Sequence, residues 1–455
     1  MNATPHAALD GARLSLGWGL PFVGLLLSIA VLPLVAPKFW HAHYGKVTAA
    51  WALAFVIPFA VVLGTGVALH EVVHAILVEY IPFIAVLFAL FTIAGGICIA
   101  GELRASPALN TGVLALGAAL ASVMGTTGAS MLLVRPLLTA NEGRRFRAHA
   151  VVFFILLVGN VGGALSPLGD PPLFIGFLKG VDFTWPARAL FVPTVAMVSA
   201  LLLVFYLVDR VLMARERASG GPAPLPDPPV RRIALEGAAN LLLLCAVIGA
   251  VLMSGLWRPG VTLDVMGTPL PLQNVLRDAL LFALALASLA ITPKAIREHN
   301  AFHWEPILEV AKIFAGIFVT IIPVLAILAA GRHGALGGLE QLLARADGSL
   351  DNHALFWVTG VLSAFLDNAP TYLVFFNLAG GDAQALMGRQ AATLTAISMA
   401  AVYFGALTYI GNAPNFMIKA IAEDRGVAMP SFFAYFGWAS LLMLPLLVVV
   451  AAIWV

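Results

Sequence analysis

The sequence predicts an all-α polytopic membrane protein with two inverted-topology repeats, each of five spans, one re-entrant helical hairpin and one broken helix. Three observations predict this fold. The chain is 61% hydrophobic and only 11% charged, whereas soluble proteins average about 25% charged residues. Apolar runs long enough to cross a bilayer recur along the chain. A polar interruption inside one run has a close copy 242 positions later.

The duplicated interruption is GALSPLGDPPLF at 163–174 and GALTYIGNAPNF at 405–416. Two pairs of polar residues match, Ser166 with Thr408 and Asp170 with Asn412. Lipid offers no partner to free backbone groups, so a helix interrupted at membrane depth must line a cavity inside the protein. Breaks at matching places in two halves indicate the binding site of a transporter.

The apolar runs give the predicted spans and repeats. Spans are expected at 15–37, 47–68, 81–101, 148–178 and 189–209 in a first repeat (1–213), and at 233–256, 275–293, 305–331, 391–418 and 431–455 in a second (231–455). The runs 148–178 and 391–418 carry the breaks. Segments 107–140 and 352–380 have polar residues near their centres and are predicted as re-entrant hairpins. The Pro/Gly-rich stretch 214–230 is the predicted cytoplasmic linker.

Charge sets the predicted orientation. An odd number of crossings in each half gives the halves opposite orientations. Lys and Arg concentrate on the loops of one side, as at 144–147 and 210–232, and the positive-inside rule puts that side in the cytoplasm. We expect a multi-pass protein of the cell's inner (cytoplasmic) membrane with both chain ends outside. The net charge of +2 points to no nucleic-acid partner.

The two predicted hairpins match each other at a separation of 241. SVMGTTGAS at 122–130 meets SAFLDNAPT at 363–371, with Gly128 and Pro370 as predicted turn residues. The polar tip residues are Thr126, Thr127 and Ser130 in the first hairpin and Asp367, Asn368 and Thr371 in the second. The C-termini of half-helices with such oxygens suit a hard cation, and half-helix N-termini suit an anion.

Asp170 and Asp367 are the charged residues at the breaks. A carboxylate at the bilayer centre costs about 3 kcal/mol or more, so it persists only beside a partner such as a cation or a proton. We therefore predict a site that alternates between a metal ion and a proton on these two acids. The alternative is that both carboxylates only cap half-helices. The predicted neutral ligands are Asn160, Ser166, Asn368, Thr371, Thr408, Asn412 and Asn415.

Four further polar residues lie in or beside the spans. Arg135 either snorkels to the basic loop at 144–147 or contacts an anion. Glu309 and Lys312 are three positions apart on one helix face and are predicted to pair. His149 is predicted to lie at the membrane interface.

His70-Glu-Val-Val-His74 fits the H-E-x-x-H pattern of zinc peptidases. The predicted topology places it in a loop at the outer end of a span, and no third ligand is identifiable. An intramembrane zinc protease is therefore a distant alternative, and we expect neither an enzyme nor a resident cofactor.

At residues 363–371 and at the two broken-helix motifs the chain resembles the ion transporter superfamily, whose members include NhaD-type sodium/proton antiporters, arsenite permeases, citrate–metal symporters and dicarboxylate symporters. The resemblance covers nearly the whole chain. Asp367-Asn368-x-Pro370 most resembles the antiporter branch, whereas Thr126-Thr127 stands where antiporters tend to carry acids. The resemblance implies a homodimer whose hairpins and broken helices move elevator-fashion against a scaffold.

The leading functional prediction is a secondary active transporter that exchanges Na⁺ for H⁺. The alternative is Na⁺-coupled transport of citrate, a dicarboxylate or another small anion. In that alternative Thr126, Thr127 and the Asn residues of the second half hold the anion's oxygens, with sodium beneath. The neutral first hairpin favours the alternative, and the lack of a clear, deep Arg for bidentate carboxylate binding disfavours it.

Overall fold

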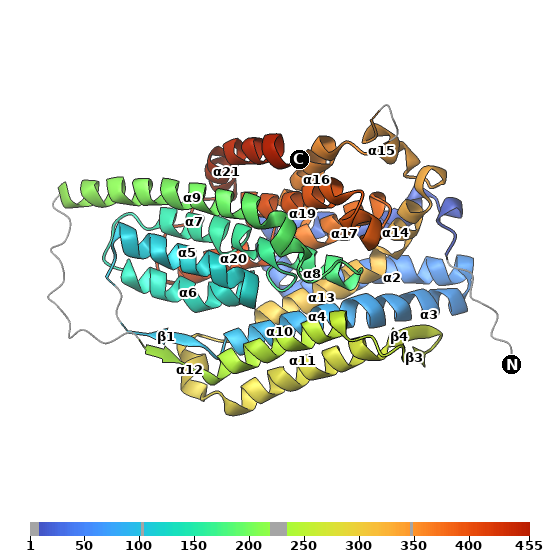
Figure 1. Cartoon of the computed structure of the whole chain (residues 1–455), viewed down its shortest axis with the longest axis horizontal. Helices are drawn as coiled ribbons and strands as arrows, with labels where there is room; N and C mark the ends of the chain where they lie inside the picture. The colour runs from blue at the N-terminus through green and yellow to red at the C-terminus, as the bar shows by residue number, and fades with distance from the viewer. Residues whose placement is uncertain (1–8, 102–103, 219–233, 346–348) are drawn as a thin grey trace.

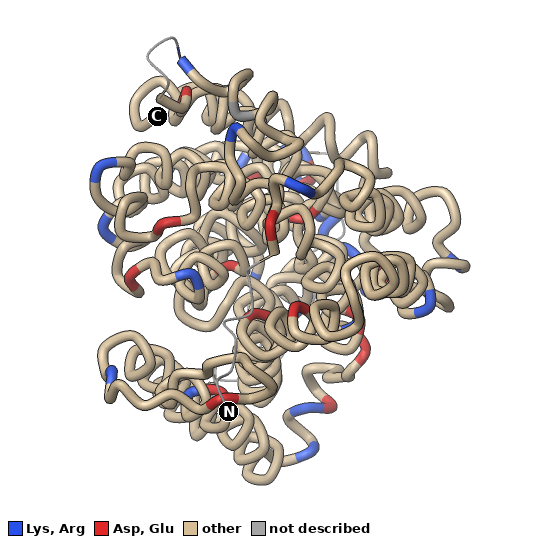
Figure 2. The backbone as a smooth tube through the Cα atoms, turned by 90° about the vertical axis from the view of Figure 1, so that its right-hand side faces the viewer, with Lys and Arg blue, Asp and Glu red and all other residues tan. Residues whose placement is uncertain are grey.

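The computed structural model describes residues 9–101, 104–218, 234–345 and 349–455. They form a bundle of helices that run mostly along the longest axis of the molecule (Figure 1). Acidic and basic residues are sparse along the backbone (Figure 2). The described residues contain nine helices long and apolar enough to cross a membrane, or ten if the bent pair 305–329 is one span. The predicted polytopic helical architecture is confirmed.

The early spans pack with three spans of the second half. This first helix group comprises α1 (Leu20–Val35), α2 (Pro37–Leu63), α3 (Thr65–His74), η3 (Ala75–Tyr80), α4 (Ile81–Ala94), α10 (Ala239–Leu256), α11 (Leu272–Ile291) and α13 (Glu305–Thr320). Helix α2 packs on α1 and α13, and α4 packs on α10 and α11 along the lower edge of Figure 1. Only 17% of the most apolar window of α2 is buried, as a lipid-facing helix requires.

The hairpin and broken-helix segments pack together. This second helix group comprises α5 (Pro107–Met124), α6 (Thr126–Ala140), α7 (Ala148–Leu157), η4 (Val161–Leu165), α8 (Pro171–Leu178), α9 (Trp185–Ala218), α16 (Asn352–Leu366), α17 (Asn368–Leu378), α19 (Ala391–Phe404), η6 (Gly405–Leu407), α20 (Ala413–Asp424) and α21 (Phe432–Trp454). Its centre is the segment 148–165, which is 89% buried. The polar breaks therefore lie inside protein.

The remaining described elements are short, and one of them, α14, is the second part of the bent span 305–329. They are η1 (Gly11–Arg13), η2 (Leu16–Gly19), α12 (Lys294–His299), α14 (Ile322–Ala329), η5 (Gly331–His333), α15 (Gly337–Leu342), α18 (Ala383–Met387) and four strands, β1 (Cys98–Ala100), β2 (Ala234–Glu236), β3 (Thr262–Val265) and β4 (Thr268–Pro271). β1 pairs antiparallel with β2 near α12, and β3 pairs with β4 at the opposite end (Figure 1). These small sheets were not predicted.

The prediction of a loop between residues 68 and 81 is wrong. Helices α3 and α4 are joined through η3, so residues 65–94 form one helical span. The π-helical turn η3 ends at Tyr80, two residues before Pro82, and such a turn accommodates the proline ring and the carbonyl that proline leaves without a donor. His70 and His74 consequently lie on a helix rather than in a loop.

The boundary between the predicted repeats also shifts. Helix α9 continues to Ala218, so the predicted linker cannot begin at residue 214. Positions 219–230 of that linker lie outside the described residues.

The breaks in 107–140 and 352–380 lie three residues before the predicted turns. Helix α5 ends and α6 begins at Gly125, and α16 and α17 meet at Asp367, where φ is +81° and +79° respectively. Gly128 and Pro370 instead lie in the first turn of the following helix, where proline loses no intrahelical hydrogen bond. The true spacing of the breaks is 242, as for the broken helices, rather than 241. The re-entrant course of these segments stays a prediction.

Candidate functional site

Asp170 lies at the centre of a buried polar cage. It occupies the N-cap position of α8 but makes no side-chain capping hydrogen bond, so the capping alternative is wrong for this residue. Its side chain is 1% exposed. The carboxylate accepts hydrogen bonds from Asn368 Nδ2 at 2.6 Å, Asn412 Nδ2 at 3.0 Å and Thr126 Oγ1 at 3.4 Å. Residues from four helices therefore meet on one carboxylate.

Asn412 links Asp170 to the first broken helix. It holds the N-cap position of α20, again without a capping bond. Its Nδ2 lies near three acceptors: Asp170 Oδ1 at 3.0 Å, the Gly159 carbonyl oxygen at 3.1 Å and Asn160 Oδ1 at 3.2 Å. One amide thus faces three acceptors, more than its two hydrogens can satisfy at once.

A second amide pair continues this chain of contacts. Asn160 Nδ2 donates to Asn415 Oδ1 at 2.7 Å, and Asn415 Nδ2 donates to the carbonyl oxygens of Gly405 and Thr408, each at 2.8 Å. Asn160 and Asn415 are fully buried. The two broken segments are therefore joined through side-chain amides that satisfy carbonyls freed by the breaks.

Ser166 and Thr408 tie each broken segment to the neighbouring helix pair. Ser166 Oγ donates to the Ser122 carbonyl oxygen, and Thr408 Oγ1 donates to the Ala364 carbonyl oxygen. Ser122 Oγ adds a bond to the Gly162 carbonyl at 2.5 Å. These hydroxyls hold the ends of α5 and α16 against the breaks.

Glycines let the broken segments fold back on themselves. A Cβ built on Gly169 would lie 2.0 Å from the Gly163 carbonyl oxygen, and one on Gly411 would lie 2.6 Å from the Gly405 carbonyl oxygen. Thr126 N donates to the Gly169 carbonyl at 2.9 Å, which fixes the start of α6 on this turn. A side chain at position 169 or 411 would force the peptide groups apart.

Asp367 has a different role from Asp170 in this geometry. Its carboxylate caps α17 by accepting from Ala369 N at 3.1 Å, and its carbonyl accepts from Thr371 Oγ1 at 2.7 Å. Its backbone (φ +79°, ψ 141°) matches that of Gly125 (φ +81°, ψ 150°), a conformation that strains a residue with a side chain. The capping alternative therefore describes the contacts of Asp367.

Two of the predicted tip residues carry a buried side-chain oxygen without a partner in the described part of the chain. Asn368 Oδ1 and Ser130 Oγ are buried and have no hydrogen-bond partner among the described residues. Thr127 is half-buried. A buried polar atom without a partner is where an ion, a water or a ligand is expected. The open Asn368 oxygen is on the same amide that binds Asp170.

A family model described as "Putative citrate transport" matches residues 11–455. The chain belongs to this citrate transport family. It is thus a multi-pass secondary transporter of the ion transporter superfamily, its substrate is a small anion, and it is not an enzyme. The family favours the anion-transport alternative over Na⁺/H⁺ exchange. A comparison with curated proteins gives no match.

The zinc-protease alternative is wrong for this transporter. His70 and His74 lie on α3 with ring centroids 6.4 Å apart. The described residues contain no group of three His, Cys, Asp or Glu side chains that could hold a metal. The H-E-x-x-H pattern lies on a helix of a transporter and not in a protease.

The transporter also has a buried charged cluster that the sequence did not predict. Asp209 of α9 is fully buried and accepts from Arg144 Nη1 at 2.5 Å, His149 Nε2 at 2.9 Å and Asn110 Nδ2 at 2.9 Å. His149 is buried within the protein, and its placement at the membrane interface stays a prediction. The only sequence signal was an acid near the end of a long apolar run, which resembles an ordinary interfacial charge.

Two other polar residues of the predicted spans lie away from the cage. Lys312 Nζ lies 5.2 Å from the centroid of the Tyr44 ring, while the Glu309 carboxylate accepts a hydrogen bond from Trp40, so the predicted pair is wrong. Arg135 lies on α6, and its buried Nη1 has no hydrogen-bond partner among the described residues. Arg135 is outside the Asp170 cage.

Proposed function

We propose that this protein is a Na⁺-coupled symporter of citrate or a related di- or tricarboxylate, with Asp170 as the coupling carboxylate. The observation that carries the proposal is the set of neutral donors on Asp170. Thr126, Asn368 and Asn412 come from three different breaks, and all three donate to it. These are the donor types that a substrate carboxylate requires in a site without a paired arginine.

Asp170 competes with the substrate for these donors. Two negative charges about 4 Å apart repel by about 4 kcal/mol at an effective dielectric constant near 20. A carboxylate substrate is therefore disfavoured while Asp170 is charged and unpaired. Sodium beside Asp170 neutralises it and frees Asn368 and Asn412 to donate to the substrate. Coupling follows because the cation must bind before the anion.

Oxygens for sodium are available beside Asp170. Sodium is a hard cation and prefers carboxylate, amide and hydroxyl oxygens. Asn368 Oδ1 lacks a partner among the described residues, and Thr126 Oγ1 already faces the carboxylate. Asn160 Oδ1 is reached through Asn412. We assign these oxygens, with Asp170, to the cation.

The proposal includes two inverted repeats that carry the site. Matching features at a spacing of 242 support this: the backbone at Gly125 and Asp367, and the uncapped positions Asp170 and Asn412. Neutral donors from both halves converge on Asp170. The basic loops would face the cytoplasm and the protein would form a homodimer in the inner membrane.

Elevator movement of the second helix group against the first completes the proposal. The residues of the cage belong to α6, α8, α17 and α20 or to the breaks beside them, all in the second group. That group can therefore carry the cage as a unit. An ion pair joins the groups, because Lys179 at the end of α8 lies 2.5 Å from Glu79 Oε1 in η3. This contact must open if α8 moves past η3.

Na⁺/H⁺ exchange remains a second candidate function. It is favoured by one observation, that Asp170 is a buried carboxylate with only neutral hydrogen-bond partners. Such a group can hold either a proton or a cation. In this candidate no organic anion is needed for turnover.

The test is uptake of radiolabelled citrate into proteoliposomes under an inward Na⁺ gradient, with K⁺ as the control cation. We expect Na⁺-dependent uptake by the wild type and loss of that dependence in Asp170→Asn. Asp182→Asn is the matched control, since Asp182 is exposed and outside the cage. Wild-type Na⁺-driven uptake in Asp170→Asn would exclude the coupling role. Collapse of a pH gradient by Na⁺ without citrate would establish the second candidate instead.

A further inference from the structure

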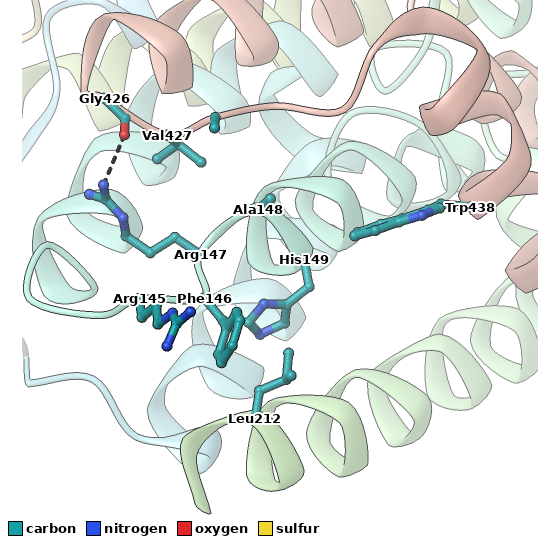
Figure 3. Close-up of a pocket in the computed structure, with 10 residues that line it drawn as sticks. Arg145, Phe146, Arg147, Ala148, His149, Leu212, Gly426, Val427 and Trp438 are labelled. Atoms are coloured by element: carbon teal, nitrogen blue, oxygen red, sulfur yellow. Dashed lines mark hydrogen bonds between the residues drawn. The ribbon is translucent and has the colours of Figure 1, made fainter. Parts of the chain in front are cut away.

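A separate pocket lies at the base of α7, between α9 and the segment after α20. Its volume is about 320 Å³, and no residue of the Asp170 cage lines it. Arg145 and Arg147 lie at one end, His149 in the middle and Trp438 of α21 at the other end (Figure 3). The lining contains no carboxylate. The pocket is therefore a basic cavity with an aromatic side chain at one end.

The two arginines of this pocket are not neutralised by nearby acids, whereas the ring of His149 is already bound to Asp209. Asp209 is bound by Arg144 and His149, and Glu216 accepts from Arg144 Nε at 3.1 Å and from Phe146 N at 2.6 Å. Arg147 Nη2 donates to the Gly426 carbonyl oxygen at 2.9 Å, which holds its guanidinium at the rim (Figure 3). Among the described residues neither pocket arginine forms an ion pair with a carboxylate.

Arg145 is held by an apolar contact. Its guanidinium carbon lies 5.5 Å from the centroid of the Phe146 ring, and the side chain is exposed. A contact with a ring face uses none of the guanidinium N–H groups. All of the N–H donors of Arg145 are therefore available to a ligand. Two arginines with free donors suit a phosphate group.

The other end of the pocket continues into a lipid-facing surface. Trp438 is 47% exposed, and Leu441 and Val448, on nearly the same face of α21, are 77% and 54% exposed. Only 28% of the most apolar window of α21 is buried. A tryptophan beside basic residues is typical of the membrane–water interface. A small soluble anion would make no favourable contact with this apolar strip.

We propose that this pocket binds the phosphate of an anionic phospholipid whose acyl chain lies along the exposed face of α21. Basic pockets between membrane helices bind anionic lipid headgroups, and the apolar strip extends the contact into the bilayer. Arg147 and Gly426 join the start of α7 to the segment after α20, so the headgroup bridges the two halves of the chain. The site is independent of the substrate cage.

The test is native mass spectrometry of the full chain titrated with phosphatidylglycerol or phosphatidylcholine in detergent. We expect one phosphatidylglycerol per chain to bind in preference to phosphatidylcholine. Each arginine near an anionic headgroup contributes about fivefold in affinity, so Arg145→Gln should weaken binding about fivefold and the double variant with Arg147→Gln about 25-fold. Arg215→Gln is the control, since Arg215 is exposed at the same end of α9 and outside the pocket.

The outcomes distinguish a lipid from a soluble anion. Equal phosphatidylglycerol affinity in the wild type and Arg145→Gln would overturn the proposal; Arg145 has only the contact with Phe146, so this variant should keep the fold. Displacement of the lipid by millimolar inorganic phosphate would show that the pocket takes free anions and would also overturn it. Retention of the lipid in phosphate, with loss in the arginine variants alone, supports it.

Discussion

Replacing Asp367 with glycine or alanine separates its backbone strain from its charge. The residue has φ +79°, which costs a side chain-bearing residue about 1–3 kcal/mol. Its carboxylate caps Ala369 N, and losing a cap costs about 1 kcal/mol in an alanine variant but only a few tenths in a glycine variant. Asp367→Gly should therefore be about 1–2 kcal/mol more stable than the wild type, whereas Asp367→Ala should be about 1 kcal/mol less stable.

Thermal unfolding of the three proteins in one detergent measures this order. A glycine variant that melts below the alanine variant would refute the strain argument. The same variants then test the charge, through Na⁺-driven citrate uptake. Wild-type uptake by Asp367→Gly would show that coupling does not use this carboxylate and would leave Asp170 as the coupling acid.

Three further changes test other contacts. Asp209→Asn leaves the buried Arg144 guanidinium without its closest carboxylate and should destabilise the protein by about 3 kcal/mol, seen as a lower melting temperature than for the exposed control Glu142→Gln. Asn415→Ala strips two buried carbonyl oxygens of their donor, so we expect a loss of about 1–3 kcal/mol; unchanged melting would contradict the amide link between the breaks. Glu79→Gln and Lys179→Met should be non-additive in a double-mutant cycle of stability, and additive losses would mean that the ion pair carries no coupling.

The sequence predicted the cage well because its residues sit at local interruptions. Asp170, Asn368 and Asn412 each precede or start a helix that contains proline in its first turn, and such a start inside an apolar run is visible without a structure. Which tip residues face the cage was not predictable. Thr126 Oγ1 donates to Asp170, whereas Thr371 Oγ1 donates to the carbonyl oxygen of Asp367 at the start of its own helix. The two side chains point in different directions because moving a helix start by one residue rotates every following side chain by about 100°.

The Asp209 cluster could not be predicted for a different reason. Its contacts join positions 60 to 99 apart, and no periodicity within one helix brings Asn110, His149 and Asp209 together. Arg144 resembled one more basic loop residue that sets orientation. The prediction of a loop at His70 and His74 was wrong because two charges and two imidazoles interrupt the apolar run there, but the helix continues through them.

The crossing of Gly163 and Gly169 leaves no room between two peptide groups. Any heavier residue there would displace Asp170, which follows directly. Selection for a new cargo must therefore act on the side chains that surround this crossing, because the main chain itself has no freedom to widen. Relatives that carry different anions should be found to differ at the amide and hydroxyl positions while their main chains superimpose.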